Sequence, residues 1–82
     1  MKLYVYCLAD DIDVLDDPAP GISGAPVRLL ETEGLSVLVS NLEADVIQVT
    51  RENALAHAAV VRSILDRTTP VPFRFGTLVT EQ

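Results

Sequence analysis

The chain has 82 residues, 49% of them hydrophobic, and its twelve acidic and six basic residues give a formal net charge of −6. This length fits one small domain, and no apolar run reaches the ~18–20 residues that a membrane-spanning helix needs. A chain this acidic repels phosphate groups and anionic lipid, so neither nucleic acid nor a membrane is expected to be the main partner.

Residues 2–9 are predicted to form the first strand. Alternation assigns Leu3, Val5 and Cys7 to one face and Tyr4, Tyr6 and Leu8 to the other. Because both faces are apolar, we expect a central strand that a helix covers on at least one side. Residues 10–20 follow with five aspartates and two prolines, a composition typical of a solvated loop, and residues 21–24 form a flexible corner.

Residues 25–32 and 35–42 are predicted to pair as two strands joined through Glu33 and Gly34. A glycine at that place supplies the positive φ of a tight hairpin. The second strand alternates Leu35, Val37 and Val39 with Ser36, Leu38 and Ser40. This pattern indicates a sheet with one well-buried face.

A helix is predicted from the N-cap residue Thr50 to about Arg67, where Thr68, Thr69 and Pro70 end it. The helical period places one apolar stripe on Ala54, His57, Ala58, Val61, Ile64 and Leu65, with Val60 at its edge. We expect this helix to lie across the sheet. Residues 70–79 are then extended, and their two prolines place the start of the segment at a sheet edge or in a bulge.

The order of these elements predicts an α+β fold. We expect a mostly antiparallel sheet of about four strands with one long helix on one face, an incomplete ferredoxin-like arrangement. An uncovered sheet edge or apolar surface then favours self-association of the isolated domain. Thr80 and Glu81 look like the start of another helix, so residues 1–82 are expected to be cut from a longer protein.

His57, the only histidine, lies on the apolar stripe of the predicted helix. A catalytic pairing with Cys7, the only thiol, is conceivable, but no third, orienting group is specified. We therefore favour a histidine at the core edge that donates one hydrogen bond while its ring packs. Cys7 is expected to be a small buried hydrophobe, and a single cysteine excludes an internal disulfide.

Two further motifs do not lead to a ligand site. The five aspartates between Asp10 and Asp17 lack the spacing and the closing glutamate of a calcium-binding EF-hand loop. Residues 21–24 have the G-x-x-G form of a KH nucleic-acid loop but lack its basic flanks. We assign no catalytic, metal-binding or cofactor-binding residue to the chain.

Several segments together resemble a known family. The Y-x-Y strand at residues 3–7 is followed by GISGAPVRL at residues 21–29 and GLSVLVS at residues 34–40. HAAVV at residues 57–61 then leads into PVPFRFGT at residues 70–77. In this order and at this spacing, over nearly the whole chain, the segments resemble the gas vesicle GvpL/GvpF family.

The resemblance implies a ferredoxin-like N-terminal domain in a non-enzymatic assembly factor of gas vesicles, the gas-filled protein shells of buoyant prokaryotes. It implies contact with the major shell protein and with other accessory proteins, no cofactor, and a location at the gas vesicle or in the cytoplasm. It also implies a helical C-terminal domain that is absent here. The alternative is a small ligand-binding regulatory domain, a use to which ferredoxin-like sheets are often put.

Arg74 stands between Phe73 and Phe75. In an extended segment both phenylalanines share one face and Arg74 points to the other. Arg74 is then either solvated or paired with an acidic neighbour, or it contacts the absent C-terminal domain or a shell subunit, where arginine is favoured. The candidate protein-interaction residues are Arg74, Phe75, Gly76 and Arg28, the last because it could join Arg74 in one positive spot.

Overall fold

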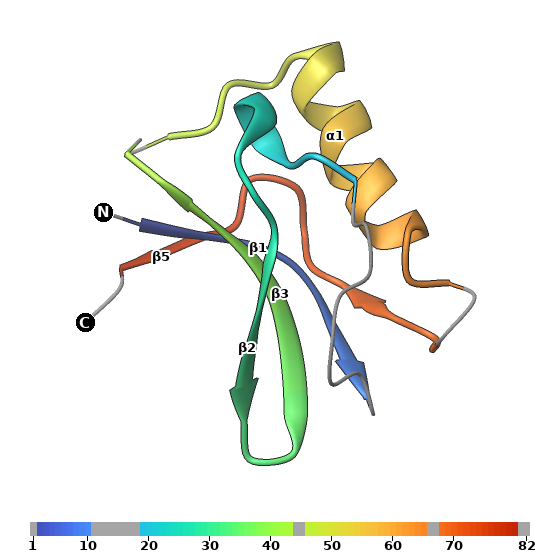
Figure 1. Cartoon of the computed structure of the whole chain (residues 1–82). Coiled ribbons are helices and arrows are strands. Elements are labelled where there is room, and N and C mark those ends of the chain that lie inside the picture. Colours follow the sequence, from blue (N-terminus) through green and yellow to red (C-terminus); the bar gives the residue numbers. More distant parts are fainter. Residues whose placement is uncertain (1, 11–18, 44–45, 66–67, 81–82) are drawn as a thin grey trace.

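The computed structural model describes residues 2–10, 19–43, 46–65 and 68–80. In chain order its elements are β1 (Lys2–Asp10), the 3₁₀ helix η1 (Ile22–Gly24), β2 (Arg28–Thr32), β3 (Leu35–Leu42), α1 (Arg51–Arg62), β4 (Val71–Pro72) and β5 (Leu78–Thr80). Figure 1 shows α1 crossing one side of the sheet, with η1 beside it.

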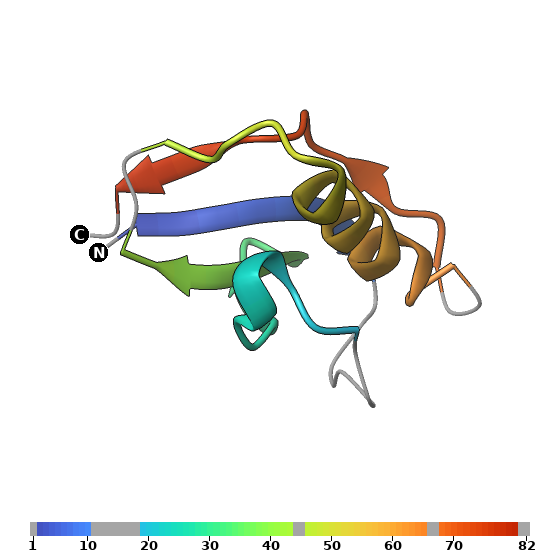
Figure 2. The same cartoon turned by 90° about the horizontal axis from the view of Figure 1, so that it is seen from above.

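The sheet has the strand order β2-β3-β1-β4, and β5 pairs with the first part of β1. All of these pairings are antiparallel. β3 lies between β1 and β2, and β1 lies between β3 and β4. The strand pairs β1/β2 and β3/β4 are thus each split by a strand of the other pair, as in a ferredoxin-like fold. Figure 2 shows β1 running between β3 and the segment that carries β4 and β5. The predicted α+β class and antiparallel sheet are confirmed.

A β-bulge in β1 changes which side chains share a face. Val5 lies opposite Val39 and Cys7 lies opposite Leu38, so Tyr6 is an extra residue in the ladder. An extra residue shifts the alternation of all later side chains by one. Cys7 accordingly packs in the cluster of Tyr4 and Tyr6, and the prediction that it shares a face with Leu3 and Val5 was wrong.

The two faces of the sheet bury clusters of different size. The larger cluster lies on the side of α1 and consists of Tyr4, Tyr6, Cys7, Ala9, Ile22, Leu38, Val60 and Ile64. The smaller one consists of Leu3, Val5 and Val39, with Val37 and Phe73 packed against it. On β3 the serine-bearing face turned out to be the better buried one, because Leu38 joins the larger cluster and Ser40 is completely buried.

The helix begins as predicted but is shorter. The Thr50 side chain accepts a hydrogen bond from the backbone N–H of Asn53, which confirms the cap. α1 ends at Arg62 instead of near Arg67, where the Ser63 hydroxyl donates to the Val60 carbonyl and the next backbone bonds become i→i+3. No helix of the described ranges is long and apolar enough to cross a bilayer.

The buried side of the helix differs from the predicted stripe. His57, Val60 and Ile64 are buried, whereas Ala54 and Leu65 are exposed. Val60, expected at the edge of the stripe, is completely buried and lies at its centre. The stripe faces β1 and η1, with which α1 makes its main contacts to other elements.

The C-terminal segment is divided into two short strands. β4 is the last strand on its side of the sheet, as the prolines of residues 70–72 predicted. The expectation that residues 70–79 stay extended was wrong, because a turn at residues 74–77 separates β4 from β5. Phe73 and Phe75 consequently pack on opposite faces of the sheet, Phe73 with the smaller cluster and Phe75 with the larger.

Candidate interaction site

The turn between β4 and β5 presents Arg74 to solvent. The N–H and the hydroxyl of Thr77 both donate to the Arg74 carbonyl, at 3.2 and 2.6 Å. Gly76 has φ +91°, the positive value that a type II turn requires at its third residue. Phe75, in the second position, is half-buried against the larger cluster, and Arg74 is exposed. The sequence Arg-Phe-Gly-Thr therefore forms a turn that has one aromatic side chain inside and one cation outside.

Contacts with β1 and α1 hold this turn in place. The Gly76 N–H donates to the Tyr4 hydroxyl at 3.0 Å, and the Val5 N–H donates to the Thr77 carbonyl at 3.0 Å. The Phe75 ring stands edge-on to the rings of Tyr4 and His57, with centroids 6.5 and 5.9 Å apart. The backbone that carries Arg74 is thus fixed from both sides of the turn.

His57 links the helix to the same network through both of its ring nitrogens. The Tyr4 hydroxyl lies 2.8 Å from His57 Nδ1, and a hydrogen bond joins the ring to the backbone of Phe73. The Phe73 N–H already donates to the Tyr6 carbonyl, so the ring donates to the Phe73 carbonyl. This assigns the proton to Nε2 and makes Nδ1 the acceptor of the Tyr4 hydroxyl proton. The expected packed histidine that donates one hydrogen bond is found here, and it accepts one as well.

The surroundings of His57 and Cys7 favour the uncharged form of each side chain. Burial lowers the pKa of His57, and the hydrogen bond to the Phe73 backbone opposes this in part. Burial raises the pKa of the Cys7 thiol to about 11. A thiol with such a pKa is protonated at neutral pH, whereas the thiolate is the nucleophile. Cys7 therefore has the expected character of a small buried hydrophobe.

A second tyrosine of β1 holds the corner before β2 in the same manner. The Tyr6 hydroxyl donates to Ser40 Oγ at 2.8 Å and accepts from the Ile22 N–H at 3.0 Å. Ser40 Oγ donates in turn to the Pro26 carbonyl at 2.8 Å. Gly21 packs so closely that a Cβ there would overlap the Tyr6 hydroxyl. Gly21 and Ile22 of the corner, which the sequence suggested to be flexible, are therefore buried and hydrogen-bonded in the core, while Ser23 and Gly24 are exposed.

A surface hollow of about 520 Å³ lies against the Arg74 turn. Lys2, Val46, Ile47 and residues 74–78 line it. Two of these side chains are cationic, Lys2 from β1 and Arg74 from the turn, and none of them is acidic. The candidate contact residues Arg74, Phe75 and Gly76 therefore belong to one concave surface, which we call the basic hollow.

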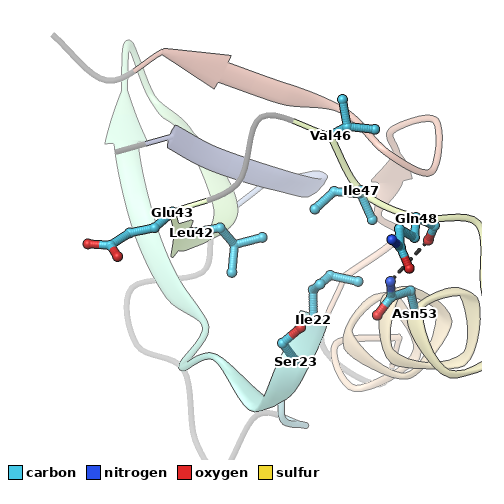
Figure 3. A pocket seen from close by; sticks show the side chains of 8 residues that line it. All are labelled: Ile22, Ser23, Leu42, Glu43, Val46, Ile47, Gln48 and Asn53. Atoms are coloured by element: carbon cyan, nitrogen blue, oxygen red, sulfur yellow. Dashed lines mark hydrogen bonds between the residues drawn. The ribbon is translucent and has the colours of Figure 1, made fainter.

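A second hollow of about 420 Å³ also borders the Val46–Ile47 segment. Figure 3 shows Ile22, Leu42 and Ile47 meeting there from three separate segments, while the Glu43 side chain points away. The Asn53 amide donates to the Gln48 carbonyl at 3.0 Å and ties the connecting segment to the first turn of α1. This second hollow has an apolar wall and a polar rim.

Arg28 does not lie near the basic hollow. It is on β2, which β3 and β1 separate from β4, and its Nε donates to Asn41 Oδ1 at 2.8 Å. Arg28 pairs with Val39 of β3, and Val39 pairs with Val5 of β1. The Val5 N–H in turn donates to the carbonyl of Thr77, in the turn. Three strand spacings of ~4.8 Å each, or about 14 Å, therefore separate Arg28 from the turn. A single positive spot formed by Arg28 and Arg74 is therefore not present.

Sequence reasoning missed Lys2 and the hydroxyl of Tyr4. Lys2 pairs with Leu42 on one side and Thr80 on the other, and only this pairing brings it near Arg74. No group of three His, Cys, Asp or Glu side chains in the described ranges is placed to hold a metal ion. Four of the five aspartates considered for calcium, all but Asp10, lie outside those ranges.

The fold is similar to that of a solved gas vesicle protein. The crystal structure of the gas vesicle protein GvpF from Anabaena sp. PCC7120 superposes with a TM-score of 0.82 over 98% of this chain, at 21% sequence identity. The chain covers 35% of that protein and so spans about a third of its length. A comparison with curated proteins finds no significant match.

The sequence itself matches a family profile over residues 2–82, nearly its whole length. The matching family is described as gas vesicle synthesis protein GvpL/GvpF. The segments that suggested this resemblance include the two tyrosine-anchored loops, the corner at residues 21–26 and the turn at residues 73–77. The chain belongs to the gas vesicle synthesis protein GvpL/GvpF family.

Proposed function

We propose that this domain is a non-enzymatic assembly factor that contacts the major gas vesicle shell protein during vesicle formation. The observation that carries the proposal is the exposed Arg74 on a turn held by Tyr4 and Val5, in a chain of the GvpL/GvpF family. Arginine is enriched among residues that dominate interfaces, and a fixed backbone lowers the entropy lost on binding. Phe75 and Gly76 contribute by setting the shape of the turn.

The proposal includes the place and the other partners of the domain. It acts at the gas vesicle or in the cytoplasm, together with other accessory proteins and without a cofactor. In a longer parent protein it forms the N-terminal domain and packs against a helical C-terminal domain. The buried thiol and the uncharged, hydrogen-bonded His57 support a structural role over a catalytic one.

A pull-down with the major shell protein tests the contact. We expect the wild-type domain to bind and an Arg74→Ala variant to bind more weakly, with unchanged thermal unfolding. Arg62→Ala is the matched control because Arg62 is also exposed but lies at the end of α1. Equal binding by both variants would contradict the contact at the turn, and no binding by the wild type would contradict the assembly role.

The second hollow favours a different function, a small ligand-binding regulatory domain. Its volume of about 420 Å³ falls in the range of ligand sites, and Ile22, Leu42 and Ile47 give it an apolar wall. A thermal-shift screen against amino acids and nucleotides tests this alternative. A raised midpoint that is lost in an Ile47→Asp variant would support it, and a flat screen would argue against it.

We also propose that the isolated domain self-associates. β2 is the terminal strand on its side of the described sheet, and Leu30 and Leu35 in the β2–β3 hairpin are exposed by 38% and 40%. A free strand edge bordered by apolar side chains pairs readily with another chain. Light scattering that gives the mass of one 8.9 kDa chain over a wide concentration range would contradict this.

A further inference from the structure

We propose that the basic hollow is a recognition site for a carboxylate side chain that lies next to an apolar side chain on a partner protein. This inference rests on the proposed function for the identity of the partner and adds the chemistry by which the partner is recognised. It also adds Lys2 to the contact and removes Arg28 from it.

The basic hollow differs in charge from the chain as a whole. The chain carries a net charge of −6, but those of the described residues that line the basic hollow include two cations, Lys2 and Arg74, and no carboxylate. Neither cation has an ion-pair partner among the residues that the structure describes. A concave surface of one sign concentrates groups of the opposite sign, so this hollow attracts an anionic side chain to an otherwise anionic protein.

The backbones of both cations are fixed before binding. Lys2 is held in the ladder between Leu42 of β3 and Thr80 of β5. Arg74 is the first residue of the turn that Tyr4 and Val5 hold. The guanidinium fork of Arg74 matches the two oxygens of a carboxylate, and the Lys2 ammonium adds a point charge.

The lining of the basic hollow also has an apolar part. Phe75 and Leu78 are half-buried and pack against the larger cluster, and Val46 is exposed by 75% at the hollow. An exposed valine next to two cations fits an apolar side chain that accompanies the carboxylate. A nucleic acid or an anionic lipid surface fits less well, because the rest of the chain repels extended arrays of negative charge.

Charge reversal in matched pairs tests the site with the shell protein as the binding partner. We expect Lys2→Glu/Arg74→Glu to weaken binding to the immobilised major shell protein at least about tenfold at 50 mM NaCl. The control Arg51→Glu/Arg62→Glu changes the net charge equally but alters two exposed arginines of α1 that do not line the basic hollow. It should change binding less than about twofold, because charges at a distance are screened. Equal weakening by the two double variants would overturn the proposal.

A second measurement does not depend on the shell protein. An NMR titration follows the amides of the wild-type chain with the blocked peptide Leu-Glu-Leu and with its neutral counterpart Leu-Gln-Leu. We expect shifts at Lys2, Arg74 and residues 76–78 with the glutamate peptide only, and none in the Lys2→Glu/Arg74→Glu variant. Equal shifts with both peptides, or no shifts with either, would overturn the carboxylate site.

The two measurements separate the two proposals. If the wild-type chain fails to bind the shell protein but responds to the glutamate peptide, the assembly role fails and the carboxylate site stands. If the chain binds the shell protein and the charge reversal of Lys2 and Arg74 leaves that binding unchanged, the carboxylate site fails and the assembly role stands.

Discussion

The corner at residues 21–26 and the turn at residues 73–77 are two irregular loops that β1 holds by the same means. Each loop donates one backbone N–H to a tyrosine hydroxyl, Ile22 to Tyr6 and Gly76 to Tyr4, and each tyrosine hydroxyl has a further side-chain partner. Their surroundings differ. Ile22 is exposed by only 2%, whereas Arg74 lies on the surface.

The glycines of the two loops show what this difference means. Gly21 is required by space, because a Cβ there would overlap the Tyr6 hydroxyl. Gly76 is required by conformation, because its φ is +91° although a Cβ there would meet no atom within 4 Å. The corner thus serves the core, while the turn uses the core as a support for an exposed cation. A binding role consequently fits the turn better than the corner.

The largest effect should come from Gly21→Ala. The added methyl would displace the Tyr6 hydroxyl and disturb its bonds to Ser40 and Ile22, so we expect a loss of about 3 kcal/mol in the free energy of unfolding. Urea unfolding measures it. Gly24→Ala is the comparison, since Gly24 lies in the same corner but an added Cβ there meets no atom within 4 Å; its φ is +75°, whereas that of Gly21 is −86°. Similar losses in the two variants would mean that the corner is not tightly packed.

A smaller effect is expected from removing either tyrosine hydroxyl. Tyr4→Phe leaves the Gly76 N–H and His57 Nδ1 without their partner, and Tyr6→Phe does the same to the Ile22 N–H. Each change should lower the free energy of unfolding by about 2 kcal/mol.

Hydrogen exchange then shows whether the two loops are separate. The Gly76 amide should exchange faster only in Tyr4→Phe, and the Ile22 amide only in Tyr6→Phe. If both amides were to respond in both variants, the corner and the turn would form one cooperative unit.

Gly76→Ala should lower the free energy of unfolding by about 1–2 kcal/mol, because alanine is strained in the left-handed region, although its Cβ would meet no atom here. The turn should relax from its geometry and move Arg74. We therefore expect the variant to bind the shell protein more weakly than the wild type does, even at a temperature where the variant remains folded. Unchanged binding would show that the position of Arg74 does not depend on the turn.

The smallest effect concerns pH. Burial lowers the pKa of His57 in the folded state below the ordinary value of 6.5, so the unfolded chain binds a proton first as the pH falls. The free energy of unfolding should therefore decrease as the pH drops below 6.5, until the folded-state pKa is reached. Urea midpoints at pH 7.5, 6.5 and 5.5 measure this, with the non-titrating His57→Gln variant as the reference. The same slope in both proteins would assign the pH dependence to other groups.

Much of the fold could be predicted from local pattern. The first strand, the hairpin turning at Glu33 and Gly34, the cap at Thr50 and the proline-marked edge strand each depend on a few neighbouring residues. The end of the helix was harder to predict, because Ser63 competes for a backbone carbonyl without any break in the apolar period. The packed His57 was predicted in kind, but its two bonding partners were not.

For the candidate site, Arg74, Phe75 and Gly76 could be named from their motif, and the structure places them on one turn. Arg28 was grouped with them in error, because no sequence pattern indicates how many strands separate two segments. Lys2 was overlooked for the same reason, since it reaches the basic hollow only through pairing with β3 and β5.

The sequence alone determined the α+β class, the order of the elements and the family, since hydrophobic period, turn residues and caps act between near neighbours. Only the tertiary structure decided three other features: the bulge that moves Cys7 to the face of Tyr4 and Tyr6, the turn that puts the two phenylalanines on opposite faces, and the meeting of Lys2 with Arg74. These features depend on strand register and on hydrogen bonds between distant residues, which the local alternation of side chains does not encode.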